Sequence, residues 1–146
     1  MIVLFDIDGV LTDSKNNPID PGVKLLAAFS REHICFVTAR PEVRRAETEM
    51  SLENISRKVG IAFNKHQLYM RQNDDKRRDS AVKTDLVEQI IREKEDDQFD
   101  WEDKTYMLVD DTYENIRAVR RKSPQVSGLF FNPSENKKKE RFTYFG

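Results

Sequence analysis

Short apolar runs alternate along the chain with longer segments in which apolar residues recur every three or four positions. The short runs are bounded by charged or turn-forming residues and predict buried strands within 1–5, 34–37, 62–70, 105–109 and 126–131. The periodic segments predict helices over 21–31, 41–56, 79–94 and 113–121. Strands that alternate with helices predict an α/β fold, a Rossmann-like parallel sheet of about five strands flanked by helices.

The predicted domain covers residues 1–131, and residues 132–146 are expected to form a basic C-terminal tail. This tail contains the run Lys137-Lys138-Lys139-Glu140-Arg141. A solvated tail is the favoured interpretation of the run, and a grip on a nucleic-acid backbone is the alternative. Parallel sheets bind ligands beyond the carboxyl ends of their strands, so the chemistry of this chain is expected just after its strands.

Composition narrows the class of protein. Of the 146 residues, 38% are hydrophobic and 35% are charged, and the net charge of -1 does not indicate general nucleic-acid binding. The single cysteine, Cys35, allows no intramolecular disulfide. No apolar stretch is long enough to span a membrane, and no signal segment precedes the first strand. A cytoplasmic protein is therefore expected.

Two acidic pairs follow predicted strands. Asp6 and Asp8 come directly after the first strand, where Gly9 allows a sharp turn, and Asp110 and Asp111 follow the fourth. Carboxylates this close repel one another unless a cation or a shared proton lies between them. Helix capping would use one acid of the second pair, but it leaves the first pair unexplained.

Other polar residues also follow strands or begin helices. Thr38 and Arg40 come after the second strand, where a hydroxyl and a guanidinium at a helix N-terminus are suited to phosphate, although Thr is also a common N-cap. Lys83 lies four residues after Asp79, and this spacing predicts an Asp–Lys pair on one helical face. The pair is either a surface ion pair or a device that orients the lysine into a site.

In this order along the chain, these residues resemble the motifs of the haloacid dehalogenase (HAD) superfamily. The first motif is similar to the run from Asp6 to Thr12, the second to Thr38, the third to Lys83, and the fourth to Asp110-Asp111. The resemblance spans about residues 1–122. It implies a HAD-like fold and phosphatase chemistry that depends on Mg²⁺.

A closer resemblance is to the 3′-phosphatase domain of phage polynucleotide kinases. In that family a triplet of Ser or Thr, Gly and Arg follows the second strand, and an Arg-Lys-Asp segment precedes the lysine of the helix. Arg40, Asp79 and Lys83 match positions of these motifs. Ala39 stands where Gly is usual. No Gly-rich loop ending in Gly-Lys-Ser/Thr is present, so no kinase domain is expected. The resemblance implies a phosphate-ester substrate, with 3′-phosphorylated ends of nucleic acid or nucleotides favoured.

The resemblance implies a catalytic role for four residues. Asp6 is the nucleophile that forms a phospho-aspartate. Asp8 protonates the leaving alkoxide and then activates water. Thr38 and Lys83 contact the transferring phosphoryl group, the first by a hydrogen bond and the second by its charge.

It also implies a Mg²⁺ site formed by Asp6, the carbonyl of Asp8, and Asp111. Asp110 is then expected to orient Lys83 or a metal-bound water.

Four further residues are expected at the substrate. Arg40 is suited to grip a phosphate of the substrate. Arg77, Arg78 and Asp79 precede Lys83 on a charged segment that should end near the same mouth of the sheet.

The spacing between the motifs leaves no room for a sizeable cap domain, so an open site that admits a nucleic-acid end is expected. Three alternatives stay open. The chain is a phosphatase of small nucleotides or sugar phosphates, a non-catalytic module that binds phosphate ends, or a receiver-like signalling domain. In the last class the acidic pair usually precedes the phospho-acceptor, unlike the order here. The sequence does not predict the oligomeric state.

Overall fold

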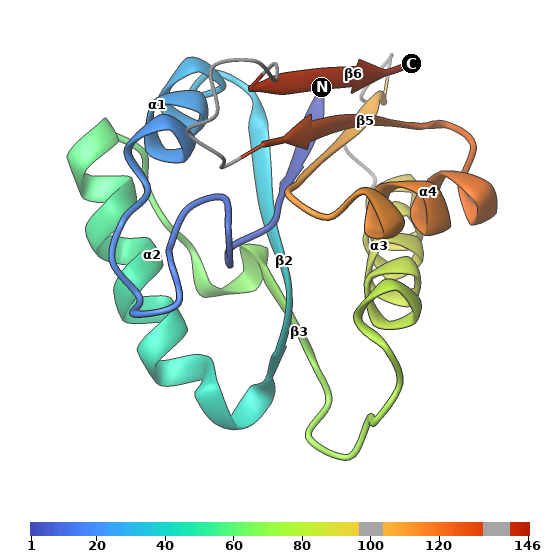
Figure 1. The fold of residues 1–146 in the computed structure, drawn as a ribbon, viewed down its shortest axis with the longest axis horizontal. Helices are drawn as coiled ribbons and strands as arrows, with labels where there is room; N and C mark the ends of the chain where they lie inside the picture. The colour runs from blue at the N-terminus through green and yellow to red at the C-terminus, as the bar shows by residue number, and fades with distance from the viewer. Residues whose placement is uncertain (97–103, 133–140) are drawn as a thin grey trace.

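A six-stranded sheet forms the centre of the structure, a computed structural model that describes residues 1–96, 104–132 and 141–146 (Figure 1). The strand order is β3-β2-β1-β4-β5-β6. Strands β1 to β5 are parallel, and β6 runs antiparallel to β5. The strands are β1 (Ile2–Phe5), β2 (His33–Pro41), β3 (Leu68–Arg71), β4 (Tyr106–Asp110), β5 (Val126–Phe131) and β6 (Phe142–Phe145).

Helices cover both faces of this sheet, which confirms the predicted α/β architecture (Figure 1). The helices are α1 (Asp20–Ala28), α2 (Arg45–Val59), α3 (Asp79–Glu95) and α4 (Tyr113–Lys122), with short 3-10 turns at η1 (Glu42–Arg44) and η2 (Lys65–Gln67). Helices α1 and α2 lie on one face, and α3 and α4 lie on the other.

The apolar run at the start of the chain becomes the centre of two hydrophobic cores. All four residues of β1 are buried, because both faces of the strand are covered. Val3 and Phe5 pack into the core under α1 and α2, whereas Ile2 and Leu4 face the core under α3 and α4. The unbroken apolar run of this strand, without polar alternation, thus follows from its central position.

Several elements begin or end away from their predicted limits. Strand β2 was predicted to end at residue 37, but it continues through Thr38 and Arg40 to Pro41, because its pairing with β3 extends to Arg71. The helix predicted from Pro41 begins only at Arg45, since Pro41 itself is extended with ψ of 154°. Thr38 and Arg40 therefore lie on the strand rather than in a loop after it.

The prediction of about five strands omitted β6, which lies in the segment 132–146 predicted as a basic tail. The sheet thus extends beyond residue 131. Phe145 packs edge-on against Tyr113 of α4 with ring centroids 5.2 Å apart, and Phe142 packs against Phe131 at 5.6 Å. These aromatic contacts hold a short edge strand in place. The strand was not predicted, because the residues directly before it are mostly charged. Most of that flank, residues 133–140, lies outside the described residues.

The described residues contain no separate cap domain, as the spacing of the motifs predicted. The chain between Asp13 and Thr38 is used by a turn and α1, and the chain between Arg40 and Lys83 by η1, α2, η2 and β3. Within residues 1–96, 104–132 and 141–146, no helix has both the length and the apolar character needed to cross a membrane.

Candidate active site

The carboxyl ends of β1 and β4 bring the two acidic pairs together. Asp6 directly follows β1, and Asp110 is the last residue of the neighbouring strand β4. Lys83, in the second turn of α3, donates hydrogen bonds from Nζ to Asp6 Oδ1 at 2.5 Å and to Asp110 Oδ2 at 2.6 Å. All three side chains are buried. Parallel pairing therefore joins residues more than a hundred positions apart in sequence.

The predicted pair between Asp79 and Lys83 does not form. Asp79 instead accepts a hydrogen bond from Arg71 at 2.7 Å, and its side chain is exposed. Lys83 turns inward, because the two buried carboxylates of Asp6 and Asp110 bind an ammonium group more strongly than one exposed carboxylate can. Asp110 thus contacts Lys83 directly, whereas its predicted roles in orienting Lys83 or a metal-bound water stay predictions.

Asp110 is held by the start of α4 as well. Its Oδ1 accepts a hydrogen bond from the backbone amide of Thr112 at 2.8 Å, and both of its oxygens lie 3.3 Å from Asn115 Nδ2. Asn115 was not identified from the sequence, although its place in the first turn after the acidic pair is a usable signal. Both oxygens of the Asp110 carboxylate thus accept hydrogen bonds from the protein, which fix the orientation of this acid.

Asp6, Asp110 and Asp111 each offer a carboxylate oxygen, and these atoms lie within 4.8 Å of one another. Burial raises the pKa of Asp6 well above its ordinary value, and repulsion from Asp110 adds to it, while Lys83 opposes the rise. Burial likewise raises the pKa of the Asp111 carboxyl. One ammonium does not balance three carboxylates, and the donor set is all oxygen. The cluster therefore fits a hard divalent cation.

Lys83 stays charged in this buried position. Burial alone would lower its pKa, but the carboxylates of Asp6 and Asp110 outweigh that effect and raise the pKa above its ordinary value. A permanent positive charge is thus fixed beside the carboxylate that is predicted to be the nucleophile.

Gly9 leaves room for the side chain of Asp111, the acid that follows β4, beside the loop after β1. Its φ of 83° lies in the left-handed region, and a Cβ at this position would lie 1.9 Å from Asp111 Oδ2. Any larger residue would have to displace the Asp111 carboxylate. The glycine of the Asp-x-Asp-Gly run is therefore required by packing against the acidic cluster as well as by the turn.

Asp8 is held by a different partner from the other acids. The Arg40 guanidinium binds its carboxylate with two nitrogens, Nη2 to Oδ1 at 2.7 Å and Nε to Oδ2 at 2.9 Å. The side chain of Asp8 is 52% exposed, whereas that of Arg40 is 2% exposed. Asp8 therefore presents an oriented carboxylate at the surface of the site, away from the buried cluster.

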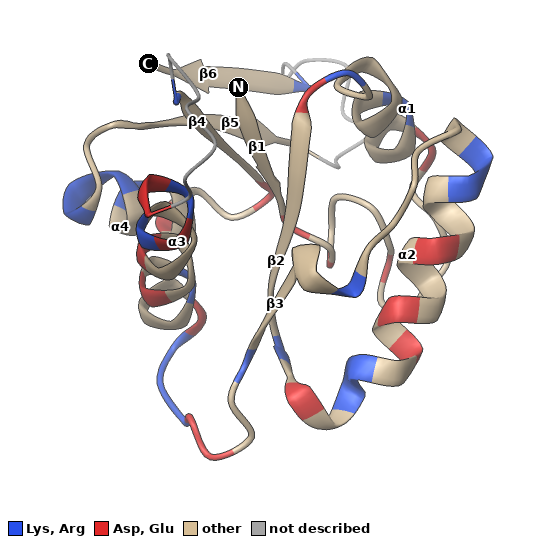
Figure 2. Ribbon diagram, turned by 180° about the vertical axis from the view of Figure 1, so that it is seen from behind, with Lys and Arg blue, Asp and Glu red and all other residues tan. Residues whose placement is uncertain are grey.

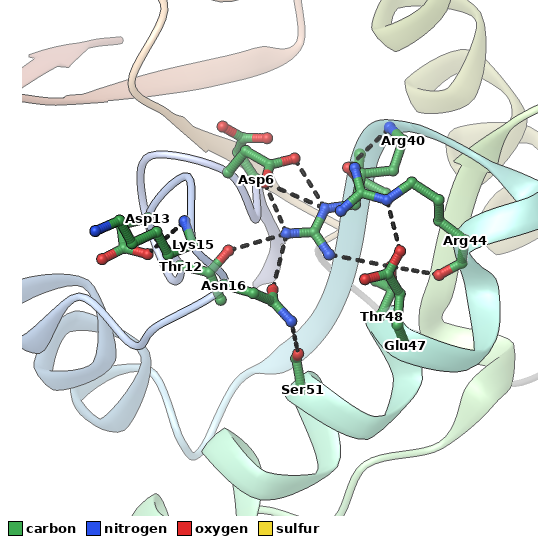
Figure 3. A network of polar contacts seen from close by, with 12 residues as sticks. Asp6, Thr12, Asp13, Lys15, Asn16, Arg40, Arg44, Glu47, Thr48 and Ser51 are labelled. Carbon is green, nitrogen blue, oxygen red and sulfur yellow. Dashed lines mark hydrogen bonds and ion pairs between the residues drawn. The ribbon is translucent and has the colours of Figure 1, made fainter.

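The remaining donors of Arg40 are bound by protein groups (Figure 3). Nη2 also lies 3.1 Å from Thr12 Oγ1 and 3.1 Å from Asn16 Oδ1, and Nη1 lies 3.2 Å from Thr48 Oγ1. The expected contact of Arg40 with a phosphate of the substrate stays a prediction. The structure places its guanidinium inside the protein, where it orients Asp8. Thr12 is the last residue of the first motif, whereas Asn16 and Thr48 had no local signal, because the loop before α1 and helix α2 meet Arg40 only in the folded chain.

Thr38 is fully buried on β2, and its hydroxyl accepts a hydrogen bond from the backbone amide of Arg40 at 3.1 Å. Its predicted hydrogen bond to a phosphoryl group stays a prediction.

The three other substrate residues predicted from the sequence lie on or beside the segment after β3. Arg77 is bound to Asp75 at 2.8 Å and to Asp85 at 2.7 Å, and it lines a separate depression of 280 Å³. Arg78 is exposed, with Glu114 of α4 at 3.5 Å. Of Arg77, Arg78 and Asp79, only Asp79 lines the cavity that contains Asp6.

That cavity has a volume of 480 Å³ and is strongly acidic. Its charged lining consists of Asp6, Asp8, Asp13, Asp79, Lys83 and Asp111. Acidic and basic residues are otherwise interspersed over the outer helices (Figure 2). A phosphate ester would meet net negative charge here, so a bound cation is needed for it to enter favourably.

Comparison with known proteins agrees with this geometry. The family profile described as the polynucleotide kinase PNKP phosphatase domain matches residues 3–123. Two solved structures share the fold at 20% identity: "Structure of Pnkp1/Rnl/Hen1 complex", with a TM-score of 0.56 over 84% of this chain, and "Structure of the Pnkp1/Rnl/Hen1 RNA repair complex", with 0.59 over 82%. The matched regions span 42% and 39% of those chains. No curated protein sequence matches. The chain belongs to the HAD-type phosphatase-domain family of polynucleotide kinase PNKP.

Proposed function

We propose that this phosphatase domain is a Mg²⁺-dependent phosphomonoester hydrolase that removes 3′-phosphates from nucleic-acid ends or nucleotides through a phospho-aspartate on Asp6. The observation that carries the proposal is the convergence of Asp6, Lys83 and the Asp110-Asp111 pair at the carboxyl edge of the sheet, with Asp8 oriented beside them. One cavity thus holds a nucleophile, a fixed cation and an acid–base group.

In the first half-reaction a carboxylate oxygen of Asp6 attacks phosphorus, and the bond from phosphorus to the leaving 3′-oxygen breaks. A protonated Asp8 gives its proton to that oxygen, so the product leaves as an alcohol. Lys83 lies beside Asp6 and supplies positive charge to the phosphoryl oxygens, while Thr38 donates a hydrogen bond to them.

In the second half-reaction water attacks the phosphorus of phospho-Asp6. Asp8, now a carboxylate, takes a proton from that water, and the bond between phosphorus and the aspartate oxygen breaks. Inorganic phosphate leaves and the Asp6 carboxylate is restored. The exposed position of Asp8 suits this step, because solvent water can reach its carboxylate.

Mg²⁺ would be held by the carboxylates of Asp6 and Asp111 and by the carbonyl of Asp8, with Asp110 placed beside them. When bound, it supplies positive charge to the phosphoryl oxygens. The raised pKa values of Asp6 and Asp111 and the excess of carboxylates over ammonium groups support a cation here.

The nucleic-acid substrate is supported by the family and by the open cavity. The described residues place no cap over the site, so the end of a polymer can reach it. The "RNA repair complex" named for one structure of similar fold is consistent with such a substrate. We propose nucleic-acid ends rather than sugar phosphates on these grounds.

The test is phosphate release from matched oligonucleotides with a 3′-phosphate or a 5′-phosphate, from 3′- and 5′-mononucleotides and from sugar phosphates, each with and without Mg²⁺. We expect kcat/KM to be highest for the 3′-phosphorylated oligonucleotide. Equal kcat/KM for sugar phosphates would favour the small-molecule phosphatase. Binding of 3′-phosphate ends without turnover would favour a non-catalytic end-binding module.

The charged segment before α3 gives a second test of the substrate. Arg77 is bound by both Asp75 and Asp85, whereas Arg78 is more exposed and is paired with Glu114 at 3.5 Å, so Arg78 is the better candidate for a phosphate contact. Arg78→Ala should weaken binding of an oligonucleotide and reduce its dependence on salt, and it should leave a small aryl phosphate unaffected. Arg77→Ala is the matched control.

A further inference from the structure

We propose that Asn16 is a positioning residue for Asp8, acting through Arg40. The proposal rests on the acid–base role of Asp8 in the proposed function. It assigns a role in the reaction to a loop side chain that the sequence motifs do not include.

Asn16 uses both ends of its side-chain amide. Oδ1 accepts the hydrogen bond from Arg40 Nη2 at 3.1 Å, and Nδ2 donates to Ser51 Oγ of α2 at 2.7 Å (Figure 3). These two bonds fix the amide between β2 and α2. The loop is thereby tied to the guanidinium that binds Asp8.

The backbone at Asn16 is arranged to aim this side chain inward. Its φ is 65°, and it is the one non-glycine residue with positive φ in the part of the chain that the structure describes. The turn that holds it is closed by Asp13 Oδ1, which accepts from the amides of Lys15 and Asn17, both at 2.9 Å. Asn tolerates this backbone state better than most residues do, and the closed turn holds its side chain where it contacts Arg40.

The orientation of Asp8 depends on this arrangement. Its carboxylate is half exposed, and the guanidinium of Arg40 is what holds it among the described residues. That guanidinium is in turn fixed by Thr48 at Nη1 and by Thr12 and Asn16 at Nη2. If Asn16 is lost, Nη2 loses a fixed acceptor, so the plane of the guanidinium and the carboxylate can turn together. Proton transfer is sensitive to small displacements of this kind.

Loss of Asn16 should affect only the step in which Asp8 gives a proton to the leaving group. An alkyl leaving group, such as the 3′-oxygen of a nucleotide, must be protonated as it departs, whereas a good aryl leaving group departs without this help. Loss of a positioning residue should therefore lower kcat/KM for alkyl phosphates and spare kcat/KM for aryl phosphates. A general structural defect would lower both.

Asn16→Gly is the sharpest variant, because glycine keeps the positive φ and removes only the side chain. The outer side of Asn16 borders an open depression of 450 Å³, so its removal leaves no sealed void. Ser51→Ala is the second variant, since it releases the same amide from α2 without changing the loop. Asn17→Ala is the matched control, because Asn17 is exposed and contacts the turn through its backbone.

The measurement is kcat/KM for a 3′-phosphorylated nucleotide and for an aryl phosphate, in the wild type, these variants, Asp8→Asn and the double variant Asn16→Gly/Asp8→Asn. We expect Asn16→Gly to lower kcat/KM for the 3′-phosphorylated nucleotide about tenfold. This is a part of the loss expected for Asp8→Asn. The aryl value of Asn16→Gly should stay within about twofold, and this variant should cause no further loss when Asp8 is already Asn. Ser51→Ala should give a smaller loss of the same kind.

Equal losses for alkyl and aryl esters, or full additivity with Asp8→Asn, would overturn the proposal and make Asn16 a structural residue. An unchanged Asn16→Gly enzyme would overturn it as well. If Asp8→Asn itself shows no dependence on the leaving group, the acid–base role fails, and this proposal fails with it. If Asp8→Asn shows that dependence and neither Asn16→Gly nor Ser51→Ala does, only the role of Asn16 fails.

Discussion

At the scale of single residues, the fold gives Asp6 and Asp8 opposite surroundings although they are the same residue type two positions apart. Asp6 is buried against Lys83 and beside two more carboxylates. Asp8 is half exposed and held by Arg40. A buried carboxylate next to the fixed ammonium group of Lys83 suits nucleophilic attack, and an exposed, oriented one suits proton transfer. The two proposed roles thus follow from environment rather than residue type.

Asp6→Asn should abolish phosphate release while the protein stays folded, because an amide cannot form the phospho-aspartate. The measurement is turnover of an aryl phosphate, with circular dichroism to confirm folding. Turnover near the wild-type rate would contradict the role of Asp6. Asp20→Asn, at an exposed site on α1, is a control that should keep full activity.

Asp6→Asn should also stabilise the metal-free protein at neutral pH. The pKa of Asp6 is raised in the folded state by burial and by Asp110, so the unfolded chain releases this proton first. The stability that Asp6 contributes is therefore lost as pH rises above the ordinary carboxyl pKa of about 4. In EDTA, the Tm difference between Asp6→Asn and wild type should grow from pH 4 to pH 7. A constant difference would contradict the raised pKa.

Asp8→Asn should reduce kcat/KM for 3′-phosphate esters by roughly 10²- to 10⁴-fold, because proton transfer to the leaving group is lost. The loss should be smaller for aryl phosphates, which need less protonation. Rates measured over a series of leaving groups test this, and an equal loss across the series would rule out the acid role.

At the scale of elements, the chemistry depends on how strands and helices end. Strands β1 and β4 end side by side, and α3 and α4 begin there, so that Lys83 reaches the acids from the second turn of α3 and Asn115 from the first turn of α4. The segment between β3 and α3 is held in place by Arg71, which donates to the carbonyls of Ala39 and Arg77 and to Asp79. This keeps the start of α3, and with it Lys83, at a fixed place.

Gly9→Ala tests the loop after β1. A Cβ there would clash with Asp111, and the left-handed backbone would be strained as well. We expect loss of activity and a higher Mg²⁺ requirement. Gly60→Ala is the matched control, because Gly60 has φ of 75° but nothing within 4 Å of the added atom. That control should cost only the strain, about 1–2 kcal/mol of stability, and keep its activity. Similar activity in the two variants would show that packing against Asp111 is unimportant.

At the scale of the whole molecule, the acidic cavity links metal binding to folding. Mg²⁺ bound by the folded state should raise Tm, by an amount equivalent to about 2.7 kcal/mol at a hundred times Kd. EDTA should remove both this stabilisation and the activity, and added Mg²⁺ should restore both. Asp111→Ala should lose the Mg²⁺-dependent rise in Tm. Full activity in EDTA would show that the acidic cluster is not a metal site.

The sequence by itself determined the layered α/β fold, the order of the five parallel strands and helices along the chain, and the residues of the acidic cluster. It did so because buried parallel strands read as continuous apolar runs and because ligands gather after such strands. Asp6, Lys83, Asp110 and Asp111 could be found in this way, since each lies at a strand or helix end.

Only the tertiary structure decided which side chains are partners. Lys83 pairs with two acids distant in sequence rather than with Asp79, and Arg40 binds Asp8 rather than facing outward. It also decided that Phe142–Phe145 forms a strand, because its contacts come from α4 and β5. All three results have the same physical reason. A charged or aromatic side chain takes the partner that best compensates its burial. The packing of the sheet determines that partner, and local sequence carries no information on this packing.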